Sequence, residues 1–149
     1  MQSLNLHKAN LIIDKALEKG RELGFAPLTV AVMDAGGHLK ALKREDGSSL
    51  LRPQIAMGKA WGVLGMGFGG RELARRAAKM PGFFNALTDL CDGKMVPVPG
   101  GVIVRDVSGE ILGSVGISGD TSDNDEICAV HGIQAAGFAP DTGDPANFK

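Results

Sequence analysis

The 149-residue sequence is poor in aromatic side chains, with no tyrosine, one tryptophan and six phenylalanines. Such a chain offers little aromatic surface for stacking on nucleic-acid bases. It also lacks an excess of charge of either sign, because 16 basic and 17 acidic residues leave a net charge of −1. Without a basic footprint, we expect neither nucleic acid nor an anionic membrane surface as a partner.

Cysteine and long apolar runs are also scarce. Cys91 and Cys128 lie far apart and form no CxxC pattern, and the chain has no HExxH motif, so we expect no zinc site. The glycines of 65–72 follow a predicted helix rather than a strand, which excludes a dinucleotide fingerprint. No glycine-rich loop is followed by the lysine of a Walker A motif, so we expect no nucleotide site. No apolar stretch approaches twenty residues, and lysines interrupt the N-terminal segment, so neither a membrane span nor a signal peptide is predicted. These features favour a cytoplasmic protein with reduced thiols.

What the sequence does contain is typical of one globular domain over residues 1–149, with 44% hydrophobic and 22% charged residues. Hydrophobic periodicity and turn residues predict alternating groups of helices and strands. The expected helices are 4–23, 53–66, 71–80, 81–93 and 127–138, and the expected strands are 27–34, 38–44, 95–101, 102–106 and 110–118. This order, α-β-β-α-α-α-β-β-β-α, predicts an α+β fold with an antiparallel sheet of about five strands and helices packed on it.

Glycine is abundant, with 22 residues, and three segments place polar groups beside glycines: 34–38, 97–101 and 118–121. Backbone without a Cβ can be approached closely by a ligand. Each segment taken alone is more typical of a turn. Gly58 and Gly62, four residues apart on a predicted helix, indicate close packing of that helix on a partner subunit or within the monomer.

Of the three histidines, His38 borders the diglycine turn and is the most accessible to a ligand. An axial haem ligand needs no local motif, only a pocket. His7, near the start of the first helix, is a rival for that role. His131 lies in an apolar helix and is expected to be a core or interface residue.

The motifs "VAVMDAGGHLKALKRED", "IAMGKAW", "RELA", "VPVPGGVIV" and "GEILGSVGISGDTSDNDE" together resemble the GlcG/HbpS family, the haem-degrading-like domain that also forms the C-terminal part of PduO-type proteins. The resemblance covers essentially the whole chain. It implies a profilin-like fold, assembly into homodimers or higher homo-oligomers, and a cleft between sheet and helices. Members of this family bind haem, and others are encoded near catabolic genes.

The resemblance also implies a set of ligand-binding residues: Gly36, Gly37, His38, Arg44, Asp46, Lys59, Gly100, Gly101 and Ser118. The leading hypothesis is a small-molecule or cofactor-binding protein with haem as the favoured ligand and His38 as axial ligand. We expect Gly37→Ala or Gly101→Ala to weaken binding about tenfold, about 1.4 kcal/mol, with little change in melting temperature.

Two alternatives remain open. In the first, the protein is an enzyme acting on a small organic acid, with Arg44 or Lys59 pairing the carboxylate. There, His38 would move a proton together with Asp34 or Glu126. In the second, the protein is an oligomeric scaffold with no active cleft.

Overall fold

The computed structural model describes residues 2–144, which form five helices and five strands. In chain order these are α1 (Leu6–Glu22), β1 (Thr29–Asp34), β2 (Leu39–Arg44), α2 (Arg52–Met66), α3 (Gly70–Lys79), α4 (Pro81–Leu90), β3 (Gly101–Arg105), β4 (Ile111–Ser118), α5 (Ser122–Ala135) and β5 (Ala139–Asp141). The strands form one antiparallel sheet in the order β2-β1-β4-β3-β5. The predicted α+β class, with a five-stranded antiparallel sheet, is confirmed.

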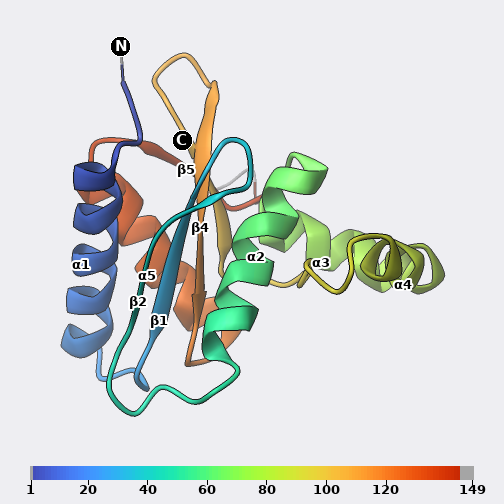
Figure 1. The fold of residues 1–149 in the computed structure, drawn as a ribbon, viewed down its shortest axis with the longest axis horizontal. Helices are drawn as coiled ribbons and strands as arrows, with labels where there is room; N and C mark the ends of the chain where they lie inside the picture. Colours follow the sequence, from blue (N-terminus) through green and yellow to red (C-terminus); the bar gives the residue numbers. More distant parts are fainter. Residues whose placement is uncertain (1, 145–149) are drawn as a thin grey trace.

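Helices α1 and α5 cover one face of the sheet, and α2 covers the other (Figure 1). On the first face, strand residues such as Val30 and Val32 are fully buried against Ile12 and Ile133. On the second face the backbones approach closely, since a Cβ on Gly116 of β4 would lie 1.9 Å from the Ala56 carbonyl oxygen of α2. The sheet is therefore buried on both faces in its centre.

Helices α3 and α4 extend away from the sheet on the side of α2 (Figure 1). They rest on a second, smaller core of buried residues: Val63, Leu73, Phe84, Met95 and Ile103. This core fixes the segment that follows α4 against α2. Among the described residues, no helix is both long and apolar enough to cross a membrane.

Side-chain caps set two of the helix starts. The Asn5 side chain accepts a hydrogen bond from the Lys8 N–H at the start of α1, and Thr121 accepts one from the Asn124 N–H at the start of α5. Each bond satisfies a backbone donor that has no partner within the helix. Thr121 is therefore the N-cap residue of α5.

The position of one strand differs from the prediction. Residues 95–100 form no sheet ladder; the Val96 N–H instead donates to the Gly58 carbonyl of α2 at 3.1 Å. Pro97 and Pro99 have no N–H, which disfavours a central strand here. The fifth strand is β5, which follows α5 and pairs with β3. The observed order thus ends β-β-α-β.

The glycine pair of α2 packs within the monomer. A Cβ on Gly58 would lie 2.6 Å from Val96 Cγ2, and one on Gly62 would lie 2.8 Å from Met95 Cγ. Of the two alternatives left open by the sequence, internal packing accounts for this spacing. It gives no argument for a partner subunit on that face.

Candidate functional site

The loop between β1 and β2 is held together by the carboxylate of Asp34. Its Oδ1 atom accepts hydrogen bonds from the backbone N–H groups of Gly36 at 2.9 Å and His38 at 3.1 Å. These bonds, led by the one from His38, lower the pKa of Asp34. Gly37 has φ +81°, a conformation that favours glycine. Asp34, Gly36 and Gly37 therefore build the turn that presents His38.

The His38 imidazole is 81% exposed, and its Nδ1 atom lies 3.2 Å from Oδ1 of Asp34. In the neutral tautomer that donates this bond from Nδ1, the Nε2 atom keeps its lone pair. A carboxylate that holds one imidazole nitrogen while the other binds a metal is the usual arrangement of metal-ligating histidines. The role of His38 as an axial ligand stays a prediction.

An apolar groove of about 390 Å³ lies beside this turn, between α2 and the loop that follows α4. Its apolar wall is formed by Met33, Met57 and Trp61, and its polar rim by Gln54, Asp92 and Lys94. Trp61, the only tryptophan of the chain, also lines a smaller hollow of about 140 Å³ with Gly36 and Gly37. A Cβ on Gly37 would lie 3.2 Å from Trp61 Nε1. The His38 turn and the groove therefore meet at Trp61.

A second polar cluster is buried between α2, β4 and α5. Lys59 Nζ donates to the Ile117 carbonyl at 2.8 Å and to Asp125 Oδ2 at 3.0 Å. Asp125 Oδ1 accepts from the Asp120 N–H at 3.0 Å. Burial lowers the pKa of Lys59 and raises that of Asp125, and the attraction between the two charges opposes both shifts.

Three other predicted ligand-binding residues surround Lys59. A Cβ on Gly100 would lie 2.9 Å from Lys59 Nζ, and one on Gly101 would lie 2.4 Å from the Lys59 carbonyl oxygen. The Ser118 hydroxyl accepts a hydrogen bond from Arg52 at 3.1 Å. All of these contacts are to protein groups, so the ligand-binding role of Lys59, Gly100, Gly101 and Ser118 stays a prediction.

The two clusters lie at opposite ends of the sheet. On β1, Thr29 pairs with Ser118, whereas Asp34 pairs with Gly113. Five residues of strand separate the two ends, about 17 Å at 3.4 Å per residue. The predicted residues therefore do not converge on one cleft, and only the His38 turn adjoins the apolar groove.

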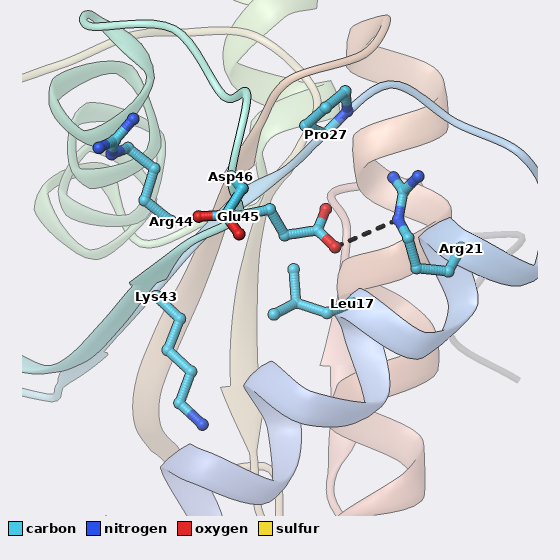
Figure 2. Close-up of a pocket in the computed structure, with 7 residues that line it drawn as sticks. All are labelled: Leu17, Arg21, Pro27, Lys43, Arg44, Glu45 and Asp46. Atoms are coloured by element: carbon cyan, nitrogen blue, oxygen red, sulfur yellow. Dashed lines mark ion pairs between the residues drawn. The ribbon is translucent and has the colours of Figure 1, made fainter.

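Arg44 and Asp46 line a different depression, of about 410 Å³, between α1 and the end of β2 (Figure 2). Its charges are mostly paired within the protein. Arg21 Nε lies 3.1 Å from Glu45 Oε2, and Arg44 donates to the Ser48 carbonyl at 2.7 Å. In Figure 2 the side chains of Lys43 and Arg44 point in different directions, as expected for neighbours on a strand.

The remaining candidates also lie apart from the groove. Glu126 accepts two hydrogen bonds from Arg71, at 2.8 and 3.2 Å, and this pairing raises the pKa of Arg71. Glu126 is thus engaged in joining α3 to α5. His7 is exposed on α1, which packs on the sheet face opposite to α2. It stays a rival ligand only for a site on that face.

The residues of the groove wall were missed by the sequence analysis. Met33, Met57 and Trp61 come from β1 and α2, and only their fold brings them together. The available signal was the spacing of Met57 and Trp61, which four residues apart on a helix share one side. In the structure Met57 and Trp61 are partly buried, and Met33 is buried.

An antiparallel α+β fold with a histidine-bearing turn beside an apolar groove defines a candidate small-molecule-binding protein. The family model described as "Haem degrading protein HbpS-like" matches residues 4–134. The chain belongs to the HbpS-like family, which confirms the resemblance noted in its sequence motifs.

Solved structures agree with this assignment. A structure described as a PduOC:heme complex has a TM-score of 0.83 and 26% identity, covering 96% of this chain and 100% of that one. HbpS has a TM-score of 0.77 and 27% identity, covering 90% of both chains. Klebsiella pneumoniae ORFY, with a TM-score of 0.79, 22% identity and 92% of both chains covered, shares the fold. Among curated proteins, none matches the sequence.

Proposed function

We propose that the protein binds a small molecule or cofactor in the groove beside the His38 turn, and that haem is the favoured ligand. The observation that carries the proposal is the pairing of His38 with Asp34, at 3.2 Å, next to an apolar wall of Met33, Met57 and Trp61. The heme complex of the similar PduOC structure supports the choice of ligand.

The groove and the turn beside it fit a haem in three respects. The wall is apolar and polarisable, as a porphyrin face requires, and the single tryptophan of the chain is part of it. Lys94 on the rim supplies a cation for a propionate. His38 supplies an imidazole whose Nδ1 is already held. When bound, haem would supply an iron centre for redox or ligand-binding chemistry.

The volume of the groove and the exposure of His38 indicate how tightly a ligand would be enclosed. At about 390 Å³, it falls within the range of about 300–1,000 Å³ typical of small-molecule sites. The open position of His38, 81% exposed, means that a ligand held there stays partly in contact with solvent. We expect reversible binding of haem rather than a fully enclosed prosthetic group.

The acid–base alternative has no comparable support. Lys59 is buried beside Asp125, Glu126 is engaged by Arg71, and Arg44 lies at the other end of β1 from His38. These groups do not surround one substrate position together with His38. The geometry therefore favours binding over catalysis with that residue set.

The proposal includes self-association and a cytoplasmic location. Membership of the HbpS-like family supports the homo-oligomer. The location is inferred from the two free thiols, Cys91 and Cys128. Burial raises the pKa of Cys128 to about 12, so this thiol is a core residue rather than a reactive group.

The groove is tested by Trp61→Ala, with Leu50→Ala as the matched control because Leu50 is 87% exposed outside the groove. Haemin is titrated into each protein and its Soret band is followed. We expect the dissociation constant of Trp61→Ala to rise about tenfold or more, corresponding to at least about 1.4 kcal/mol. Equal affinity of the two variants would place the ligand elsewhere.

A further inference from the structure

One side of α2 carries a stripe of residues that runs past both hollows beside the β1–β2 turn. Its members recur at helical spacing and are partly or fully exposed: Gln54, Met57, Trp61 and Leu64. Gln54 and Met57 line the apolar groove, whereas Leu64 and Gly65 line the smaller hollow. Trp61 lines both. The groove and the hollow are therefore neighbouring compartments along α2, with the indole ring between them.

The indole N–H of Trp61 is a free hydrogen-bond donor. Within residues 2–144, no protein group accepts a hydrogen bond from Trp61 Nε1. A Cβ on Gly37 would lie 3.2 Å from Nε1 and 3.3 Å from Cδ1, and Gly37 also lines the smaller hollow. The N–H edge of the ring thus borders the hollow. An indole nitrogen only donates, so a ligand group that enters the hollow must offer an acceptor to satisfy it.

The charges around the hollow select the kind of acceptor. No lysine or arginine of residues 2–144 lines it. A negative charge stands beside it, because Oδ1 of Asp34 would lie 3.4 Å from a Cβ on Gly36, and the hydrogen bonds that lower the pKa of Asp34 keep this carboxyl ionised. A ligand carboxylate would be repelled there. A neutral oxygen, such as a carbonyl, needs only the one donor that Trp61 provides.

The groove offers a cation at its other end. Lys94 lies on its rim, and the Lys94 carbonyl oxygen would lie 3.3 Å from a Cβ on Gly58. Gly58 precedes Gly65 of the hollow by seven residues, about 10 Å along the helix axis. Within residues 2–144, Lys94 forms no ion pair with Asp92, which shares this rim. Its ammonium group is thus available to an anionic group of a ligand.

We propose that Trp61 is a specificity-determining residue, whose N–H donates to a neutral oxygen on the part of the ligand that occupies the hollow. The inference rests on the binding site proposed above and names the class of ligand. That class is a planar apolar ring system with a carboxylate at the edge toward Lys94 and a carbonyl or similar oxygen at the opposite edge. Haem meets the first requirement and carries apolar vinyl groups where the second would stand.

Two porphyrins that differ at this edge test the hydrogen bond. Haemin carries vinyl groups opposite its propionates, and diacetyldeuterohaemin carries acetyl groups in their place. Both are titrated into the wild type and into Trp61→Phe, which keeps an aromatic ring but removes the donor. The preference for diacetyldeuterohaemin over haemin should be about threefold to tenfold larger in the wild type than in Trp61→Phe.

The comparison of ratios removes the effect of the acetyl groups on the iron, because that effect is common to both proteins. Met57→Leu is the matched control. It changes the same apolar wall and keeps the Trp61 donor, so it should retain the wild-type ratio.

The wild type alone gives a second readout, which does not depend on the folding of any variant. Trp61 is the only tryptophan, so the protein has a single indole N–H signal in its NMR spectrum. The zinc derivatives of the two porphyrins are diamagnetic and suit this measurement. The indole proton should exchange with water more slowly in the complex with the acetyl-bearing porphyrin than in the complex with the vinyl-bearing one.

The outcomes separate the two levels of inference. A wild type that binds neither porphyrin would contradict the binding site itself. Binding of both with the same ratio in the wild type and Trp61→Phe, or with equal exchange of the indole proton, would overturn the role of Trp61 and leave the site in place. If Trp61→Phe weakened both porphyrins equally but left haemin dimethyl ester unaffected, a propionate would occupy the hollow, and the neutral acceptor would be wrong.

Discussion

The ammonium group of Lys59 lies 3.0 Å from Oδ2 of Asp125, with only 4% and 1% of the two side chains exposed. The pair joins α2 to the first turn of α5 across the end of β4, where Lys59 also donates to the Ile117 carbonyl. It lies at the end of the sheet opposite to the His38 turn. We therefore assign it to the stability of the fold.

Removing one member of this pair should be strongly destabilising. Lys59→Met leaves the carboxylate of Asp125 buried without its cation, and we expect the free energy of unfolding to fall by about 3–5 kcal/mol. Urea denaturation measures this difference. The double variant Lys59→Met/Asp125→Asn should lose less than the single variant, because no buried charge is left.

The matched control is Lys43→Met, which breaks an exposed pair with Asp14. Its effect should stay below about 1 kcal/mol. If Lys59→Met and Lys43→Met lowered the free energy of unfolding equally, the buried pair would contribute no more to stability than the exposed one.

Asp120 should make the stability of the protein depend on pH. Its carboxylate accepts hydrogen bonds from the Ala26 N–H, the Thr121 N–H and the Asn124 amide, and the bond from Ala26 contributes most to lowering its pKa. A carboxyl whose pKa is lower in the folded state stabilises that state above its unfolded pKa of about 3.9. The contribution is lost as the pH falls through the folded pKa.

The variant Asp120→Asn tests this direction. At pH 7 it should be less stable than the wild type, and the difference between the two proteins should shrink as the pH is lowered from 5 to 2. Urea denaturation at several pH values gives both curves. A difference that is constant, or larger in acid, would contradict the assigned role.

Gly37→Ala and Gly101→Ala should both lower stability, by different routes. Gly37 has φ +81°, so a side chain there is expected to lower the free energy of unfolding by about 1 kcal/mol. At Gly101 the Cβ would lie 2.4 Å from the Lys59 carbonyl oxygen, and the backbone must move. We expect a loss of about 1–3 kcal/mol there.

The structure changes an expectation drawn from the sequence. Little change in melting temperature was expected for at least one of these variants, but the positive φ of Gly37 and the close approach of Gly101 to Lys59 predict a loss of stability for both. Thermal unfolding decides the point. Of the two, Gly37→Ala should weaken haemin binding beyond its stability loss, because Gly37 lines the hollow beside Trp61. If the two variants lose affinity equally, the hollow has no part in binding.

The sequence predicted the fold class and most elements because their signals are local. The helix expected over 4–23 is observed at Leu6–Glu22, with periodicity and a terminal glycine as its signals. Strand β5 was missed because it has three residues, one of them Pro140, and shows no alternation. It is supported by the ladder with β3 and by the ion pair of Asp141 with Arg105, which are contacts distant along the chain.

The candidate site was predicted only in part for the same reason. The turn around Asp34 and His38 is local, and its residues could be named from the motif. The separation of that turn from Lys59 and Ser118 depends on the register of β1 with β4, which pairs Thr29 with Ser118. Nothing in the local sequence fixes that register, so residues from both ends of the sheet were assigned to one cleft.

Haemin titration of His38→Ala beside His7→Ala is the most direct measurement of whether this protein binds haem through the β1–β2 turn. Both histidines are exposed, so neither substitution should disturb the core. The wild type and His7→Ala are predicted to give the same sharp Soret shift, and His38→Ala is predicted to lose it. A wild type without a Soret shift would contradict haem binding. A full shift in His38→Ala would contradict the assignment of the ligand to the turn held by Asp34.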